Sequence, residues 1–132
     1  MFELTGRTFG TRRLLRGMFS IDIWTYGIGG GLRMPHPFNI VIGEGVELGR
    51  RCLVLHNTTV QRGAGTIVSS DCVLGAGATV LAGSVIQRRS IVGAGAVVHG
   101  AVPEGSVVMA PGPIIQRKRN EYQKNRDRAW RN

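Results

Sequence analysis

The chain has 132 residues, of which 42% are hydrophobic, 6% aromatic and 19% charged, and its formal net charge is +9. This length predicts a single domain. No apolar run approaches the ~20 residues of a membrane span, and the N-terminus lacks the apolar core of a signal peptide, so we expect a cytoplasmic protein. The scarcity of aromatic residues beside the basic ones argues against a nucleic-acid-binding groove.

Residues 1–20 are predicted to form a short amphipathic capping segment. Leu14, Leu15, Met18 and Phe19 fall at helical spacing among arginines. A helix here would cover the first unit of the repeat described below, which would otherwise expose its core and its unpaired strand edges. The alternative is that this basic and apolar helix makes a weak peripheral membrane contact.

A repeat of six residues dominates the sequence from Ile42 to Val102, a period of neither a helix nor an ordinary strand. Its first column holds large aliphatic residues: Ile42, Leu48, Val54, Val60 and, after a slip of two residues, Val68, Leu74, Val80, Ile86, Val92 and Val98. Four residues after each of these stands a residue that is nearly always small: Val46, Cys52, Thr58, Ala64, Cys72, Ala78, Ser84, Ser90, Ala96 or Val102. Glycine directly follows the aliphatic residue at positions 43, 49, 75 and 93.

Each hexad is predicted to be one short strand and one corner of a solenoid. The aliphatic residue would point into the core, the small residue would fit where the turn brings the backbone close, and glycine would take the strained corner conformation. Three hexads would close a triangular coil, and the length allows roughly four to five coils. Upstream, Ile28 and Met34 continue the aliphatic column, with Leu32 and Phe38 in the small-residue place, before a slip of two.

The hexads resemble the repeat of the hexapeptide-repeat acyltransferases. That resemblance implies an all-β fold, a left-handed parallel β-helix, which we place at residues 21–113. The short N-terminal helix, predicted from its spacing, would precede it, and a basic tail, residues 114–132, would follow it. The hand of the coil is implied by the resemblance alone, because general rules for crossover connections favour the right hand.

The segment Met-Pro-His-Pro-Phe-Asn-Ile-Val-Ile-Gly-Glu, residues 34–44, carries the most specific part of the resemblance. It is similar to the segment of serine acetyltransferases and related sugar O-acetyltransferases in which a histidine acts as the catalytic base. His36 takes that place. A lone histidine is usually structural, but within this motif we interpret His36 as a general base that removes the proton of an acceptor hydroxyl as it attacks the thioester of acetyl-CoA.

The same resemblance assigns roles to further residues. Asp22 matches an aspartate that orients the base, although one residue is missing between it and His36, and capping a turn is its alternative role. Contacts to coenzyme A are implied for Ala94 and, more weakly, for His99, and contacts to the cofactor's phosphates for Lys118 with its neighbours Arg117 and Arg119. A solvated tail or attraction to acidic lipid are the alternatives for this basic cluster.

Stacking arithmetic adds a prediction that depends on no family. With about eighteen residues per coil and two added at each slip, Met34 stacks under Val54, Leu74 and Val92, so that one column holds His36, His56, Ala76 and Ala94, about 4.8 Å apart per step. This places His56 near His36; because His56 stands where serine acetyltransferases have a glutamine, the resemblance implies that it contacts the acceptor. The two alanines would leave a shallow groove for coenzyme A, which the resemblance places between adjacent subunits of a homotrimer.

The sequence also departs from serine acetyltransferases. Residues 61–67 stand where that family has a longer loop with an Arg-His-Pro that holds the amino acid, and we expect no counterpart of its large N-terminal helical domain. We therefore predict a sugar or cell-surface polysaccharide precursor as acceptor; serine, or a catalytically silent scaffold, is the alternative. Cys52 and Cys72 are expected to be reduced and buried. No metal is expected, because the chain lacks the His-x4-His pair of the zinc enzymes that share this fold.

Overall fold

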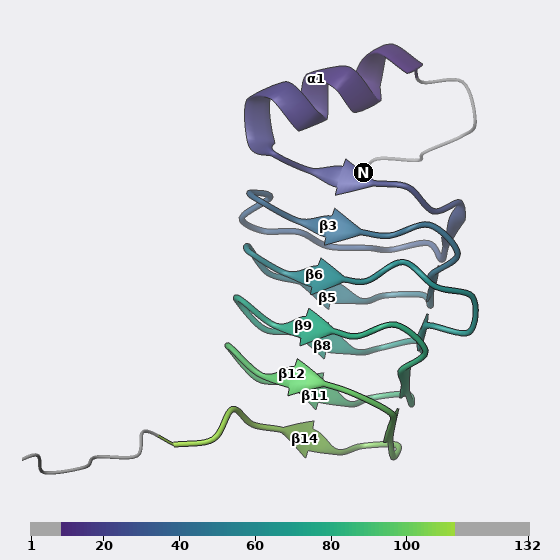
Figure 1. The fold of residues 1–132 in the computed structure, drawn as a ribbon, viewed down its shortest axis with the longest axis vertical. Coiled ribbons are helices and arrows are strands. Elements are labelled where there is room, and N and C mark those ends of the chain that lie inside the picture. Colours follow the sequence, from purple (N-terminus) through teal and green to yellow (C-terminus); the bar gives the residue numbers. More distant parts are fainter. Residues whose placement is uncertain (1–8, 113–132) are drawn as a thin grey trace, which may run out of the picture.

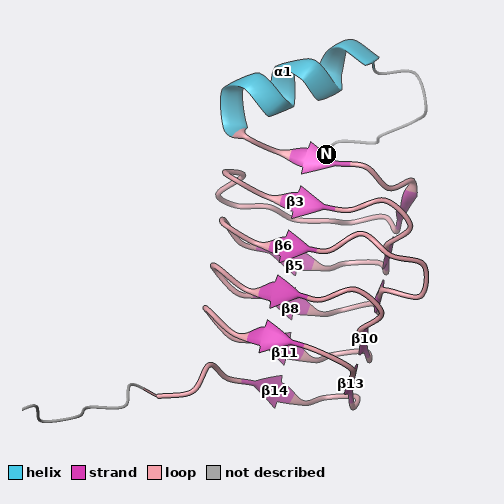
Figure 2. Ribbon diagram, in the orientation of Figure 1, coloured by secondary structure: helices cyan, strands magenta, loops and turns pink. Residues whose placement is uncertain are grey.

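The computed structural model describes residues 9–112, and the side chains of residues 13–112. The chain winds into a parallel β-helix in which successive coils stack along one axis, and one helix lies across the first coil (Figure 1). The strands are short and most of each coil is turn (Figure 2). No helix in the described part of the chain is long and apolar enough to cross a membrane.

Three parallel sheets form the three sides of the coil. Sheet A contains β1 (Asp22–Ile23), β3 (Val41–Ile42), β6 (Thr59–Val60), β9 (Thr79–Val80) and β12 (Val97–Val98). Sheet B contains β2 (Gly27–Ile28), β4 (Glu47–Leu48), β7 (Ile67–Val68), β10 (Val85–Ile86) and β13 (Ala101–Val102). Sheet C contains β5 (Leu53–Val54), β8 (Val73–Leu74), β11 (Ile91–Val92) and β14 (Val107–Val108), and Arg33 adds a parallel bridge to Leu53.

The aliphatic column is the core. Each of its members from Ile42 to Val98 is at most 3% exposed. The predicted stacking is confirmed, because Arg33 pairs with Leu53, Val54 with Leu74, and Leu74 with Val92. A narrow triangular interior therefore takes one branched side chain per strand, which is why the repeat is six residues long.

The predicted N-terminal helix is confirmed as α1 (Phe9–Phe19). Leu15 and Phe19 pack against the core of the coil, whereas Leu14 and Met18 are 58% and 63% exposed. The helix ends at Phe19, and the next residue, Ser20, has a φ of 52° that turns the chain toward the first strand. One face of α1 thus covers the end of the core, and another face carries exposed apolar side chains.

The two slips and the last coil correct the predicted hexads. Phe38 and Ala64 are exposed, and Ile40 and Thr66 are the fully buried residues in their coils. In both slips the two extra residues come before the small-residue position. The buried place predicted for Phe38 is therefore taken by Ile40, and the one predicted for Ala64 is taken by Thr66. Val102 is also not in the small-residue column: it pairs with Ile86 in β13, because the turn before it is two residues shorter than the hexad.

The glycines that directly follow the aliphatic residues were predicted to take a strained corner conformation, and that prediction is wrong. None of Gly43, Gly49, Gly75 and Gly93 has a positive φ. A Cβ at Gly43 would instead lie 2.2 Å from the backbone nitrogen of Arg62, and one at Gly75 would lie 2.7 Å from that of Ala94. These glycines are needed because the next coil passes too close for any side chain. The left-handed corner positions belong to other residues, including Arg51, Asp71 and Arg89.

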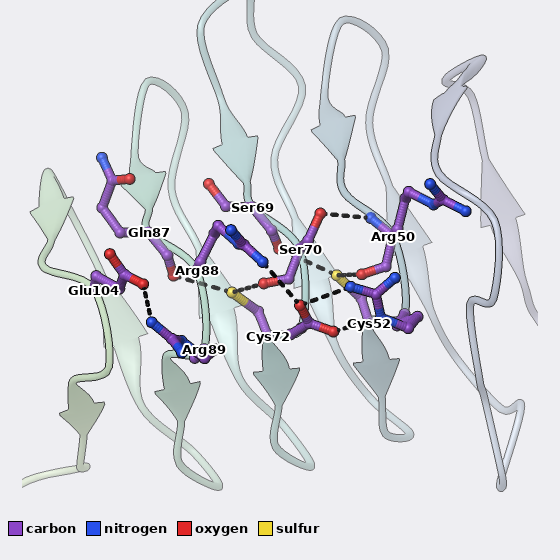
Figure 3. A network of polar contacts seen from close by, with 11 residues as sticks. Arg50, Cys52, Ser69, Ser70, Cys72, Gln87, Arg88, Arg89 and Glu104 are labelled. Carbon is purple, nitrogen blue, oxygen red and sulfur yellow. Dashed lines mark hydrogen bonds and ion pairs between the residues drawn. The ribbon is translucent and has the colours of Figure 1, made fainter.

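Two buried thiols line the turns between sheets B and C. Cys52 and Cys72 are free, as expected, and each donates to a carbonyl of the following coil: Ser69 O at 3.2 Å and Gln87 O at 3.1 Å (Figure 3). Burial raises the pKa of both thiols. They act as small core residues with weak hydrogen bonds between coils.

Charged side chains run along the outside of the same turns. Arg51 donates two hydrogen bonds to Asp71, at 2.7 and 3.0 Å, and Arg88 approaches the same carboxylate at 3.6 Å. The hydrogen bond from Arg51 holds the pKa of the Asp71 carboxyl below its usual value. Arg89 pairs with Glu104 one coil further on (Figure 3). This ladder links coils at their surface, where solvent weakens each pair.

Candidate active site

The candidate residues gather at the turns that connect sheet C to sheet A, here called the C–A edge: residues 35–40, 55–58, 75–78 and 93–96. His56, Ala76 and Ala94 stack there in register. The amide of Gly77 donates to His56 O at 3.0 Å, and that of Gly95 donates to Ala76 O at 2.9 Å. The predicted column is therefore confirmed for these three residues.

His36 lies beside this column instead of within it. The amide of Asn57 donates to Phe38 O at 3.0 Å, so Phe38 takes the register place under His56. His36 belongs to the residues that the slip adds. Its ring nevertheless meets that of His56, with centroids 6.3 Å apart and planes at 80°. Both histidines are exposed. The predicted proximity of His36 and His56 is therefore confirmed, although His36 is not in the same column.

The loop that carries His36 is restrained by two prolines and by backbone hydrogen bonds. Pro35 and Pro37 restrict the backbone before and after the histidine. The amide of Phe38 donates to His36 O at 2.8 Å, and the amide of Asn39 donates to Phe19 O at 2.9 Å, which ties the loop to the end of α1. The imidazole is thus presented on a stiff support, as a group that must align with a reacting atom requires.

A pair of asparagines next to the histidines was missed by the sequence reasoning. Asn39 Nδ2 donates to Asn57 Oδ1 at 3.0 Å, and their φ values are 53° and 56°. Gly77 and Gly95 occupy the same place in later coils, with φ of 70° and 69°. The sequence could have predicted a left-handed position at this place in each coil, because asparagine and glycine adopt that conformation most readily.

Other predicted site residues lie apart from the histidine pair. Asp22 begins β1, and its carboxylate lies 3.7 Å from Arg16, an exposed ion pair; no hydrogen bond joins the described side chains of Asp22 and His36. Its role as orienter remains a prediction. His99 follows β12 at the turn toward sheet B, which is a different edge of the coil. Arg117, Lys118 and Arg119 lie outside the described residues.

Metal chemistry has no candidate ligand cluster in the described part of the chain, where no three histidine, cysteine, aspartate or glutamate side chains come together. The histidine pair itself offers two exposed imidazoles on one rigid edge. An imidazole can accept a proton from a hydroxyl that it holds by a hydrogen bond. The arrangement therefore suits proton transfer at the surface of the coil.

Known proteins resemble this chain in sequence and in fold. A serine acetyltransferase of Buchnera aphidicola subsp. Schizaphis graminum is 33% identical over 112 residues, which are 78% of this chain and 43% of that protein. A serine acetyltransferase of Mycobacterium tuberculosis is 35% identical over 96 residues, 67% of this chain and 42% of that protein. The chain thus spans less than half the length of these relatives. No protein-family model matches it.

Among solved structures, serine acetyltransferase isoform 3 of Entamoeba histolytica, in complex with cysteine, superimposes with a TM-score of 0.67 at 24% sequence identity. The match covers 88% of this chain and 45% of that one. It shows that the coil is the left-handed β-helix that the sequence resemblance implied.

Proposed function

Starting from a serine acetyltransferase-like chain of the hexapeptide-repeat acyltransferase family, we propose that this protein is an acetyl-CoA-dependent O-acetyltransferase. The observation that carries the proposal is the histidine pair of the C–A edge. His36 and His56 come from different coils, yet their ring centroids are 6.3 Å apart, and two prolines flank His36 in its loop.

In this proposal His36 is the general base. It accepts the proton of the acceptor hydroxyl while that oxygen attacks the thioester carbon, and the thiolate of coenzyme A leaves after the tetrahedral intermediate collapses. His56 positions the same hydroxyl, since an oxygen within hydrogen-bond distance of one ring lies near the other. Asp22 would orient His36 only if it exchanged its ion pair with Arg16 for a bond to the imidazole.

The acceptor that the relatives favour is serine, because the relatives at 33% and 35% identity are serine acetyltransferases. A sugar hydroxyl, as in a polysaccharide precursor, is the second candidate. The observation in its favour is the short link at residues 61–67, in the place where the resemblance to serine acetyltransferases implies a longer loop that holds the amino acid. This link reaches out beyond its neighbours (Figure 1) without a second histidine.

The groove for the acetyl donor would follow the same edge past Ala76 and Ala94, which present no large side chain. One stack of coils offers only a shallow groove, so a second subunit must supply the other wall, and a cyclic trimer would create three equivalent sites. His99, on another edge of the coil, could then serve the site of a neighbouring subunit. Arg117, Lys118 and Arg119 are proposed to bind the phosphates of the cofactor.

Thiol release from acetyl-CoA, measured with serine and with a panel of sugars, tests the proposal and selects the acceptor. His36→Ala should lower the acceptor-dependent rate by ~10²–10⁴, the range for a lost general base, while acetyl-CoA binding and folding persist. His56→Ala should raise KM for the acceptor more than it lowers kcat.

Gln87→Ala, an exposed change on another edge of the coil, is the matched control and should leave both constants unchanged. Full turnover by the His36 variant would remove this residue from the mechanism. Absence of thiol release with every acceptor would favour the catalytically silent scaffold.

A further inference from the structure

We propose that the capped end of the coil stack, formed by α1 and the first coil, docks on an anionic membrane surface. Five large hydrophobic residues of this end are strongly exposed: Leu14 at 58%, Met18 at 63%, Trp24 at 49%, Tyr26 at 80% and Phe38 at 54%. All belong to the cap or to the first coil, and Figure 1 shows that these form one end of the molecule. Five of the nine exposed large hydrophobic residues among residues 13–112 thus lie at this end, and exposed apolar surface of this kind is typical of interaction sites.

The exposed residues are arranged around α1. Leu14 and Met18 are four residues apart and so share one face of the helix. The ring of Phe38 packs edge-on against Phe19 with centroids 5.6 Å apart. The Arg16 guanidinium lies over the Trp24 ring at 6.0 Å. With about 3.6 residues per turn, Arg16 falls on the side of α1 opposite to Leu14 and Met18, and Leu15, which packs against the core, lies between the two sides. The helix thus presents an apolar pair on one side and an arginine with an aromatic ring on the other.

The positive charge of α1 favours an anionic membrane as the partner of this surface. The helix contains three arginines and no acidic residue, and the described side chains of Arg13 and Arg16 are exposed. The nearby carboxylate of Asp22 already faces Arg16 at 3.7 Å. Arginines beside exposed leucine, methionine and tryptophan are typical of helices that lie in the headgroup region of acidic membranes. Tryptophan and tyrosine prefer this region because their rings are apolar and their N–H or O–H remains hydrated.

The expected binding is weak for one chain and stronger for an assembly. Each basic residue near an acidic bilayer contributes ~1 kcal/mol, so two or three of them with two apolar side chains give reversible binding only. In the proposed cyclic trimer with its axis along the coils, three capped ends would face the same side and bind together. The docking itself does not depend on the proposed enzymatic activity.

Docking by this end would place the histidine pair close to the lipid surface. His36 belongs to the first coil, and its loop is tied to the end of α1 by the hydrogen bond from the amide of Asn39 to Phe19 O at 2.9 Å. His56 lies one coil further away. Any acceptor presented at the membrane surface would therefore meet these residues before the rest of the C–A edge.

The test is co-sedimentation of the full chain with phosphatidylcholine vesicles that contain or lack ~30% phosphatidylglycerol, at low and at high salt. We expect binding to the anionic vesicles at low salt, and loss of binding in high salt. Arg13→Glu should lower the bound fraction at least ~5-fold, the factor that corresponds to one lost basic contact. Leu14→Ser with Met18→Ser should lower it at least as much, because two apolar side chains can then no longer be buried in the bilayer. Folding of each variant is checked by circular dichroism.

The chain offers matched controls at other places. Val107→Ser with Met109→Ser alters side chains that are 61% and 78% exposed at the opposite end of the stack, and Arg50→Glu reverses an exposed charge on another edge. These controls should bind vesicles as the unchanged chain does. Equal losses in cap and control variants, or no binding of the unchanged chain, would overturn the proposal.

Two further outcomes are distinguishable. Concentration-dependent self-association that Leu14→Ser with Met18→Ser abolishes, without vesicle binding, would show that a second copy covers this surface and would overturn membrane docking. His36→Ala should bind vesicles normally. Vesicle binding by a chain that transfers no acetyl group would therefore leave this inference standing and remove only the proposed function.

Discussion

Replacing Gly43 with alanine should separate adjacent coils. The added Cβ would lie 2.2 Å from the nitrogen and 2.4 Å from the Cα of Arg62, which are backbone atoms that cannot rotate away. The two coils are hydrogen-bonded on either side of this contact, from Gly43 N to Val60 O at 2.9 Å and from Gly63 N to Glu44 O at 3.0 Å. Overpacking costs ~1–3 kcal/mol and each of the two weakened hydrogen bonds ~0.5–1.5 kcal/mol, so we expect a loss of about 2–6 kcal/mol.

Two other glycines provide controls that divide this effect into its causes. Gly30 has open space around it and no positive φ, so Gly30→Ala should leave stability unchanged or raise it by ~0.4–1 kcal/mol. Gly83 also has open space but a φ of 77°, so Gly83→Ala should show backbone strain alone, ~1–2 kcal/mol.

The assay is the midpoint of urea unfolding at one fixed protein concentration, because the proposed trimer would make the midpoint depend on concentration. The expected order of stability is Gly30→Ala, then Gly83→Ala, then Gly43→Ala. A Gly43→Ala midpoint equal to that of Gly30→Ala would refute the reasoning that this glycine is required for close approach of the coils.

Three other predictions concern groups outside the glycines. The hydrogen bond from Arg51 lowers the pKa of Asp71 in the folded chain, so the stability that Asp71 contributes should be present at neutral pH and lost as the pH falls through that lowered pKa. Asp71→Asn should therefore lower the melting temperature at pH 7, and the difference between the two proteins should vanish in strong acid. Cys52 and Cys72 should not react with a thiol reagent at pH 8 in the folded protein, because burial keeps them protonated and inaccessible, and both should react in denaturant; rapid labelling of the native chain would contradict this. Asn57→Ala should cost ~1–2 kcal/mol by losing its hydrogen bond and straining a left-handed position, whereas Asn57→Gly should cost less, as urea unfolding of the two variants can compare.

Much of the fold was contained in local periodicity. A hydrophobic residue every six positions can be buried only by a strand and a corner that repeat, so Ile42, Leu48 and Val54 predicted the core and the stacking order. The helical spacing of Leu15 and Phe19 likewise predicted the cap. These features follow from side-chain pattern, because each coil contacts only its neighbours along the chain.

The candidate site depended on where the extra residues of the first slip were inserted, which periodicity does not determine. Counting placed His36 in line with His56, but the backbone hydrogen bonds put Phe38 there, and His36 reaches its partner from beside the column. The hydrogen bond between Asn39 and Asn57 was likewise not predicted by counting residues per coil, although asparagine at a turn is a signal for the left-handed conformation that both residues adopt.

Sequence alone determined that the chain is a solenoid with aliphatic residues inside, because a hexad pattern has no other way to bury them. The tertiary structure decided the purpose of individual positions. Gly43 is required because Arg62 of the next coil passes against it, and Leu14 is exposed because α1 turns the neighbouring Leu15 to the core. The physical reason is that the repeat determines which coils stack, whereas close approach and ring contacts depend on the path of each turn and on where the slips add residues.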